Sequence, residues 1–204
     1  MPGDKMFFRE LNTLIIDDSD GMQRLLAEML GGCVRGHITA CRTVEKGLDE
    51  LEREYFGLAV IDRELANEDG LEFVRRVRAR RGLHQKLPVV VLSVNSSREI
   101  VLETLLSGAH TLVRKPLSRH DLHVHVRRAL SEERVFTPFA SHMIPLRRSI
   151  AWKLGRNPTP QAIIEGLAAT MTLPEDRVPL IDASSATLVP ASDAGAPQDS
   201  FAFI

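Results

Sequence analysis

The chain is poor in cysteine, in aromatic residues and in net charge, and each shortage excludes a class of function. Cys33 and Cys41 are its only cysteines, too few for a disulfide framework, and neither lies in a CxxC motif. Aromatic residues make up 5% of the chain, which leaves little material for stacking on nucleic-acid bases. The formal net charge of −1 creates no overall field that would attract nucleic acid or anionic lipid.

Long hydrophobic runs are also missing. No segment approaches the ~20 apolar residues that a membrane-spanning helix needs, and residues 1–9 lack the apolar core of a signal peptide. We therefore expect a soluble, cytoplasmic protein with two reduced cysteines and no membrane partner. The length of 204 residues and the apolar content of 44% favour one domain of ordinary size with an appendage.

Four short apolar segments each end in a polar side chain. Leu58–Asp62 ends in an aspartate, Thr13–Asp18 in two, Leu87–Ser93 in a serine and His110–Lys115 in a lysine. A short continuous apolar run of this kind is typical of a buried strand. Because ligands bind at the carboxyl ends of parallel strands, the pattern predicts one edge that gathers three carboxylates, a hydroxyl and an ammonium group.

The stretches between these segments carry apolar residues at helical spacing, and helix-capping residues precede several of them. With a further short strand at 37–41, five strands alternate with five helices over about 120 residues. This alternation predicts an α/β fold in which a parallel sheet is doubly wound through right-handed crossovers.

The order and spacing of these residues resemble the receiver domain of two-component response regulators. The residues that carry the resemblance are Asp17-Asp18, Asp62, Asp69-Gly70, Ser93, Gly108-Ala109 and Lys115-Pro116. The resemblance extends over about residues 12–130, more than half of the chain. The resemblance implies a flavodoxin-like five-stranded sheet of order 2-1-3-4-5 and a receiver domain at residues 8–131.

The resemblance also implies a function. Asp62 would accept a phosphoryl group from the phosphohistidine of a sensor histidine kinase or a histidine phosphotransfer protein, and Ser93 and Lys115 would contact the transferred group. A Mg²⁺ ion would be bound by the carboxylates of Asp17, Asp18 and Asp62 and by the backbone carbonyl of Glu64. Apart from this phosphoryl transfer and the later dephosphorylation of Asp62, both with Mg²⁺, no enzymatic activity is implied.

Physical chemistry supports these roles independently. Three carboxylates at one edge repel one another, so one must be protonated or a cation must lie among them. Mg²⁺ prefers oxygen ligands and retains several waters, which suits carboxylates at an open sheet edge. Phosphoryl transfer needs mainly positioning and charge neutralisation, which Lys115 and Ser93 can provide. Taken singly, each residue has an ordinary structural explanation, such as helix capping by Asp17-Asp18. Taken together, such explanations require four coincidences at matching strand ends.

Several positions depart from the pattern of the family. Leu112 stands where the family often has an aromatic switch residue, and Leu65-Ala66 replaces the usual methionine and proline. Glu64 and Asn95 flank the pocket, and Val94 stands where a small residue is usual, which would narrow access to the phosphoryl group. We therefore expect phosphorylation without aromatic switching, with output through repacking of the Asn95–Ser107 segment. This predicted helix has more apolar surface than one face can bury, which indicates a second partner, either another subunit or the C-terminal extension.

The sequence predicts a short helical extension at residues 132–182. It also predicts a disordered tail of small and polar residues at 183–204. One predicted helix contains Leu146, Ile150 and Leu154, and a second begins at Thr159-Pro160. Such short helices must dock on the receiver, pair with a copy of themselves or fold on a partner. A homodimer could form through this extension, through the Ser97–Ser107 helix or through the last receiver helix.

Three hypotheses for function follow. The first is a phosphorylation-controlled switch that acts on a downstream protein through protein contacts. The second is a transcriptional regulator whose C-terminal helices bind DNA through the basic residues between 147 and 156. Because residues 131–182 contain equal numbers of acidic and basic residues, we do not expect a nucleic-acid partner. The third is a degenerate receiver that no longer accepts phosphate and serves only for docking.

Overall fold

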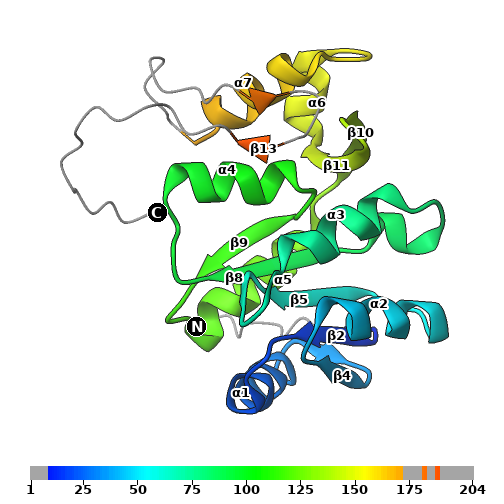
Figure 1. The fold of residues 1–204 in the computed structure, drawn as a ribbon, viewed down its shortest axis with the longest axis vertical. Helices are drawn as coiled ribbons and strands as arrows, with labels where there is room; N and C mark the ends of the chain where they lie inside the picture. Colours follow the sequence, from blue (N-terminus) through cyan, green and yellow to red (C-terminus); the bar gives the residue numbers. More distant parts are fainter. Residues whose placement is uncertain (1–8, 172–180, 183–186, 189–204) are drawn as a thin grey trace, which may run out of the picture.

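The computed structural model describes residues 9–171, 181–182 and 187–188 of the chain. A five-stranded parallel sheet of order β4-β2-β5-β8-β9 forms its centre (Figure 1). Its strands are β2 (Thr13–Ile16), β4 (Ile38–Cys41), β5 (Leu58–Asp62), β8 (Val89–Ser93) and β9 (Thr111–Arg114). The predicted fold class and the predicted order 2-1-3-4-5 are confirmed. Within these described ranges, no helix is long and apolar enough to span a bilayer.

Five helices alternate with these strands. They are α1 (Asp20–Leu30), α2 (Val44–Arg53), α3 (Leu71–Ala79), α4 (Arg98–Leu106) and α5 (Arg119–Ser131). A hydroxyl side chain caps the N-terminus of four of these helices, as the sequence predicts, and accepts a hydrogen bond from an otherwise unpaired amide of the first turn. The four capping residues are Ser19, Thr43, Ser97 and Ser118. Shorter elements complete this part: β1 (Arg9–Glu10), β3 (Val34–Arg35), β6 (Glu64–Leu65), β7 (Glu68–Asp69) and the 3-10 helix Leu83–Lys86.

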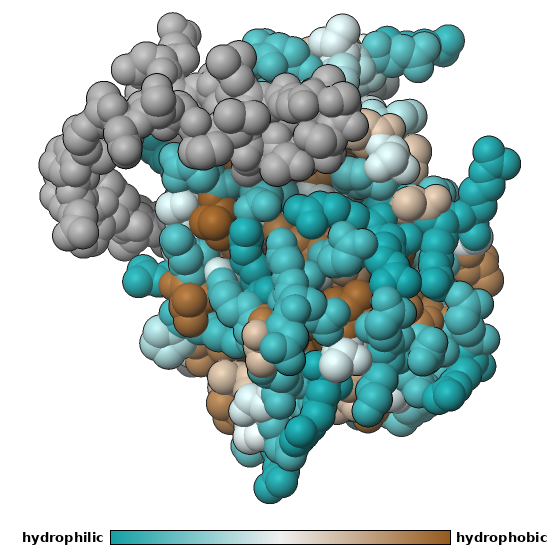
Figure 2. All heavy atoms as spheres, viewed as in Figure 1, coloured by the Kyte–Doolittle hydropathy of each residue, from teal (hydrophilic) through white to brown (hydrophobic). Residues whose placement is uncertain are grey.

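Alternate residues of the central strands pack into two separate hydrophobic layers, one on each face of the sheet. Leu14 and Ile16 of β2 point into a layer closed by α2 and α3, whereas Ile15 points into a layer closed by α1 and α5. Both faces of the sheet are therefore buried, which explains why its strands appear as continuous apolar runs in the sequence. Outside the sheet, the face in Figure 2 is largely hydrophilic, with apolar side chains visible in small separate areas.

The C-terminal extension contains a β-hairpin as well as two helices. β10 (Arg134–Phe139) pairs antiparallel with β11 (His142–Arg147), and α6 (Arg148–Leu154) and α7 (Pro160–Ala169) follow. The prediction of a purely helical extension is wrong for this hairpin, and Leu146 lies on a strand, where it opposes Val135. The predicted tail lies outside the described residues, except that β13 (Thr187–Leu188) pairs with β12 (Ile181–Asp182).

The extension docks on α4 (Figure 1). Leu102 and Leu106 of α4 belong to a third hydrophobic cluster, whose other buried members all come from the extension: Phe139, Ile144, Leu146, Ile150, Ile163, Ile164, Leu167 and Met171. The Nε2 atom of His142 also donates to the Leu106 carbonyl at 2.7 Å, near the C-terminal end of α4. The second partner that the apolar surface of α4 predicts is therefore the chain's own extension.

A buried arginine lies at the junction between α3 and the hairpin. Arg78 is fully buried, and its guanidinium donates to the carbonyls of Gln85, Leu87 and Gly108 at 2.6–2.8 Å. The ring of Phe136, from β10, lies 5.4 Å from the guanidinium carbon. Burial lowers the pKa of Arg78 to about 9, so the group remains charged at neutral pH. The arginine thus joins α3 and two loops to the extension.

Candidate functional site

The strand ends bring the predicted side chains to one edge of the sheet. Ile16 pairs with Ile61, and Asp62 pairs with Leu92, so β2, β5 and β8 end almost level with one another. Asp17 follows β2 directly, Asp62 closes β5 and Ser93 closes β8. Lys115 comes directly after β9 and its backbone amide donates to the Ser93 carbonyl at 2.7 Å.

The three aspartates form a compact acidic cluster. Asp17, Asp18 and Asp62 each offer a carboxylate oxygen, and these oxygens all lie within 4.8 Å of one another. Hydrogen bonds orient Asp17 and Asp18, because Asp17 Oδ1 accepts from the Ser19 amide at 2.9 Å and Asp18 Oδ2 accepts from the Ala66 amide at 3.0 Å. The second bond also ties Asp18 to the loop that follows β5.

Lys115 pairs with Asp62 of this cluster. Its Nζ atom donates to Asp62 Oδ2 at 2.7 Å and lies 3.7 Å from Asp17 Oδ2. The other oxygen of Asp62 accepts from the Glu64 amide at 3.2 Å. One ammonium group therefore faces three carboxylates, which leaves an excess of negative charge within this cluster.

Burial makes this charge costly. Asp17 is 1% exposed and Asp62 is 5% exposed. Desolvation raises the pKa of both carboxyls above the ordinary range, and the nearby Lys115 opposes the rise in both cases. Because the folded state favours the protonated forms, the ionised carboxylates destabilise the fold once the pH exceeds their ordinary pKa values. A cation among them would relieve this destabilisation.

Ser93 is fully buried and lies beside an acidic side chain. Its Oγ lies 2.5 Å from Glu64 Oε1 and 2.8 Å from the Asn95 carbonyl, both of which can accept its proton. The amide of Val94 donates to the other Glu64 oxygen at 3.3 Å. The sequence predicts that residue 64 binds the ion through its backbone carbonyl and that its acid flanks the pocket, whereas the hydrogen bonds of Glu64 in the structure involve its amide and its carboxylate.

A glycine allows α3 to begin close to Asp62. The Gly70 amide donates to the Arg63 carbonyl at 2.9 Å, and a Cβ atom at this position would collide with the Asp62 carbonyl oxygen. Any larger residue would displace the strand end that carries the aspartate. Gly70 of the Asp69-Gly70 pair therefore has a direct steric role, and Asp69 Oδ1 accepts from the amide of Leu71, the first residue of α3, at 2.9 Å.

Arg63 is a further residue near the site that sequence reasoning missed. It directly follows Asp62, and its Nη2 donates to Glu103 of α4 at 2.5 Å. Arg75 of α3 lies 3.5 Å from the same carboxylate. These ion pairs join the end of β5 to α4, and no motif in the sequence indicates them because the partners lie 40 residues apart.

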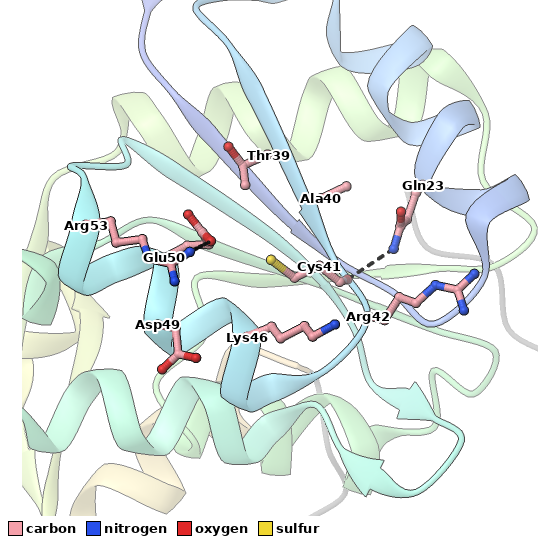
Figure 3. Close-up of a pocket in the computed structure, with 9 residues that line it drawn as sticks. All are labelled: Gln23, Thr39, Ala40, Cys41, Arg42, Lys46, Asp49, Glu50 and Arg53. Carbon is pink, nitrogen blue, oxygen red and sulfur yellow. Dashed lines mark hydrogen bonds and ion pairs between the residues drawn. The ribbon is translucent and has the colours of Figure 1, made fainter.

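Away from the acidic edge, a hollow of about 500 Å³ lies along the edge strand β4 (Figure 3). Its walls carry charges of both signs, and Arg53 and Glu50 within it pair with each other at 2.6 Å. Gln23 reaches toward β4 and donates to the Cys41 carbonyl at 3.2 Å. This hollow contains none of the strand-end carboxylates, so the candidate site remains the acidic edge.

Comparisons with known proteins agree with this arrangement. A family model described as "Response regulator receiver domain" matches residues 13–127. Among curated proteins, the KDP operon transcriptional regulatory protein KdpE of Escherichia coli is 30% identical over 119 residues, which cover 58% of this chain and 51% of KdpE. BasR, a transcriptional regulatory protein of the same organism, is 29% identical over 122 residues, which cover 59% of this chain and 52% of BasR.

Solved structures show the same fold. The BeF3-activated receiver domain of DrrB from Thermotoga maritima matches with a TM-score of 0.52 at 26% identity, covering 60% of this chain and 98% of that one. The chemotaxis response regulator CheY4 of Vibrio cholerae matches with a TM-score of 0.55 at 20% identity, covering 60% of this chain and all of that one. The chain spans about half the length of the curated relatives KdpE and BasR. With a family match over more than half of its residues, it belongs to the receiver-domain family of two-component response regulators.

Proposed function

We propose that the chain is a phosphorylation-controlled signalling switch in which Asp62 accepts a phosphoryl group from a phosphohistidine. The donor would be a sensor histidine kinase or a histidine phosphotransfer protein. The observation that carries the proposal is the meeting of the three aspartates, Ser93 and Lys115 at one edge of the sheet. Incubation with acetyl phosphate and Mg²⁺, followed by intact-mass spectrometry, tests it directly. We expect one added phosphoryl group, and its absence would leave only a docking role.

The acidic cluster fits a magnesium ion. The Oδ2 atom of Asp17 is buried and has no hydrogen-bond partner, so a ligand position is open at the centre of three carboxylates. Asp17, Asp18 and Asp62 would hold the ion, together with the backbone carbonyl of Glu64. When bound, Mg²⁺ supplies positive charge for the oxygens of the transferred group.

The protein's own groups account for the remaining requirements of the reaction. A carboxylate oxygen of Asp62 attacks phosphorus, the phosphorus–nitrogen bond breaks, and the imidazole nitrogen keeps the electron pair and gains a proton. Lys115 favours the ionised form of Asp62 and can neutralise one phosphoryl oxygen as a compact charge. Ser93, held rigidly in the core at the end of β8, can donate to another.

Magnesium is expected to stabilise the fold. An ion that binds only the folded state at a hundred times its Kd adds about 2.7 kcal/mol, which corresponds to a rise in Tm of roughly 5–10 °C for a chain of this size. Differential scanning calorimetry with and without Mg²⁺ measures the shift. Asp17→Asn removes the carboxylate that has the open oxygen, so the shift should largely disappear in this variant. A shift of equal size in both proteins would show that the ion binds elsewhere.

The response to phosphorylation would travel through α4 to the docked extension. Helix α4 carries Glu103, which pairs with Arg63 next to the acceptor, and also Leu102 and Leu106, which pack against the extension. Leu112 takes the place of an aromatic residue and lines, with α4 and β11, a hollow of about 230 Å³ in which side chains have room to repack. The extension would then present the signal to a downstream protein.

Hydrogen exchange tests this route. With BeF3⁻ and Mg²⁺, amides of residues 95–107 and of β10 and β11 are expected to change their exchange rates several-fold, because α4 contacts both the site and the hairpin. Amides of β4, at the far edge of the sheet, serve as the internal control. If residues 95–107 and the hairpin exchanged at the same rates in both states, output through this segment would be excluded.

We expect no nucleic-acid partner for the extension. Of the basic residues at 147–156, Arg147 pairs with Glu132 at 3.3 Å and Arg148 pairs with Glu133. Half of the basic groups that could contact phosphates are thus already neutralised by the extension's own acids. A strong phosphate-binding face requires more uncompensated charge than this.

A further inference from the structure

The hydrogen-bond donors at the end of β8 already hold an anion that belongs to the chain. Glu64 places both of its carboxylate oxygens on these donors, one on the Ser93 hydroxyl at 2.5 Å and one on the Val94 amide at 3.3 Å. Two adjacent donors that hold the two oxygens of one carboxylate form a small anion-binding cradle. The cradle lies next to Asp62, whose Oδ1 accepts from the backbone amide of Glu64 itself.

The Ser93 hydroxyl has one proton and two acceptors within reach. Glu64 Oε1 lies at 2.5 Å and the Asn95 carbonyl at 2.8 Å. Hydrogen bonds to an ionised acceptor are shorter and stronger than those between neutral groups, so the hydroxyl donates its hydrogen bond to the carboxylate. While this bond persists, Ser93 has no proton to donate to an incoming phosphoryl oxygen.

Exposure and charge show which partner would move. Ser93 is fixed in the core, whereas Glu64 lies on the surface and can turn its carboxylate into water without opening the fold. In its present position Glu64 also brings a further carboxylate to the end of β8, beside a sheet edge where three aspartates face the one ammonium group of Lys115. The carboxylate therefore opposes an incoming anion both by occupying its donors and by repulsion.

We propose that Glu64 is a built-in competitor of the phosphoryl group, occupying the Ser93 hydroxyl and the Val94 amide until the phosphoryl group displaces it. This inference rests on the proposed function and extends it, because it names a residue that sets how readily the site accepts an anion. The residue acts through Ser93 and takes no part in bond making or breaking.

Binding of BeF3⁻ at saturating Mg²⁺, measured by isothermal titration calorimetry, tests the inference. Glu64→Ala frees both donors and should bind BeF3⁻ about tenfold more tightly, the factor that one charge-assisted hydrogen bond typically represents. Glu64→Gln keeps the shape and an acceptor oxygen but loses the charge, so its affinity should lie between those of Glu64→Ala and the wild type. Glu99→Ala is the matched control, since it removes one exposed acid from the first turn of α4 and should leave the affinity unchanged.

A double variant separates competition from general electrostatics. In a Ser93→Ala background the main donor is absent, so adding Glu64→Ala should give a clearly smaller gain than it gives in the wild type. An equal gain in both backgrounds would mean that Glu64 acts by charge alone and would overturn the inference. If the wild type bound BeF3⁻ and Glu64→Ala bound it no more tightly, the inference would fail while the proposed function stood. Absence of binding by every protein, the wild type included, would remove the proposed function itself.

Discussion

Replacing Asp62 by asparagine is expected to abolish phosphorylation. The substitution keeps the size of the side chain, but an amide oxygen is a poor nucleophile. The single oxygen of asparagine can also accept from only one of the two donors, Lys115 and the Glu64 amide, that the two carboxylate oxygens serve. Intact-mass spectrometry after incubation with acetyl phosphate and Mg²⁺ should show one added phosphoryl group on the wild type and none on Asp62→Asn. We expect a loss of at least a thousandfold in rate, because the reacting atom itself is removed.

Asp49→Asn provides the matched control for this experiment. Asp49 is an exposed aspartate on α2, away from the strand ends, and its replacement should leave the phosphoryl group in place. Circular dichroism should confirm that both variants fold. If Asp62→Asn still gained a phosphoryl group at the wild-type rate, the acceptor would have to be a neighbouring carboxylate such as Asp18, and the assignment of Asp62 would be wrong.

The largest effect on stability is expected at Arg78. Arg78→Met keeps much of the apolar stem but leaves the carbonyls of Gln85, Leu87 and Gly108 without their donor. A buried carbonyl that loses its partner costs about 1–3 kcal/mol. This cost is partly offset because the variant no longer has to desolvate a buried guanidinium. We therefore expect the free energy of unfolding to fall by about 3–5 kcal/mol.

Urea denaturation followed by circular dichroism measures this loss. Arg81→Met is the control, because Arg81 is an exposed arginine close to Arg78 in sequence and its replacement should change stability by less than about 0.5 kcal/mol. Arg78→Lys should recover only part of the stability, since one ammonium group cannot reach three carbonyls in the directions that the planar guanidinium does. Equal stability of Arg78→Met and the wild type would show that the three hydrogen bonds contribute no net energy.

The sequence predicts the sheet and the acidic edge well because both depend on local patterns. Each central strand is a short apolar run that ends in a polar residue, and the register of parallel strands then brings those ends together. Helix starts are similarly local, since Ser19, Thr43 and Ser118 accept hydrogen bonds from amides within their own first turns. A residue's type and its immediate neighbours suffice for features of this kind.

The β10–β11 hairpin was missed because its local signals are misleading. Pro138 and Pro145 lie within its strands, although proline normally argues against a strand. Its turn contains Ala140 at a φ of +50°, where glycine or asparagine would have provided a turn signal. The four-residue spacing of Leu146, Ile150 and Leu154 resembles one continuous helix, yet α6 begins only at Arg148.

Long-range pairs mark the second limit of prediction from sequence. The apolar surplus of α4 indicates that something covers it, but the sequence alone leaves another subunit and the chain's own extension as equal candidates. The bond between Glu64 and Ser93 joins residues 29 positions apart, and that between Arg63 and Glu103 joins residues 40 positions apart. Side chains on different loops meet only after the sheet has set their distance, so no periodic pattern reports them.

The burial of α4 beneath the extension has a practical consequence for protein engineering. Chimeric sensors are often assembled by cutting a signalling module where its family match ends and fusing it to a new reporter. A cut after Ser131 in this chain would uncover Leu102 and Leu106 and would remove Phe136 from the Arg78 guanidinium. Such a fragment would expose an apolar face and would be prone to aggregate. The transferable cassette should therefore run through at least Met171.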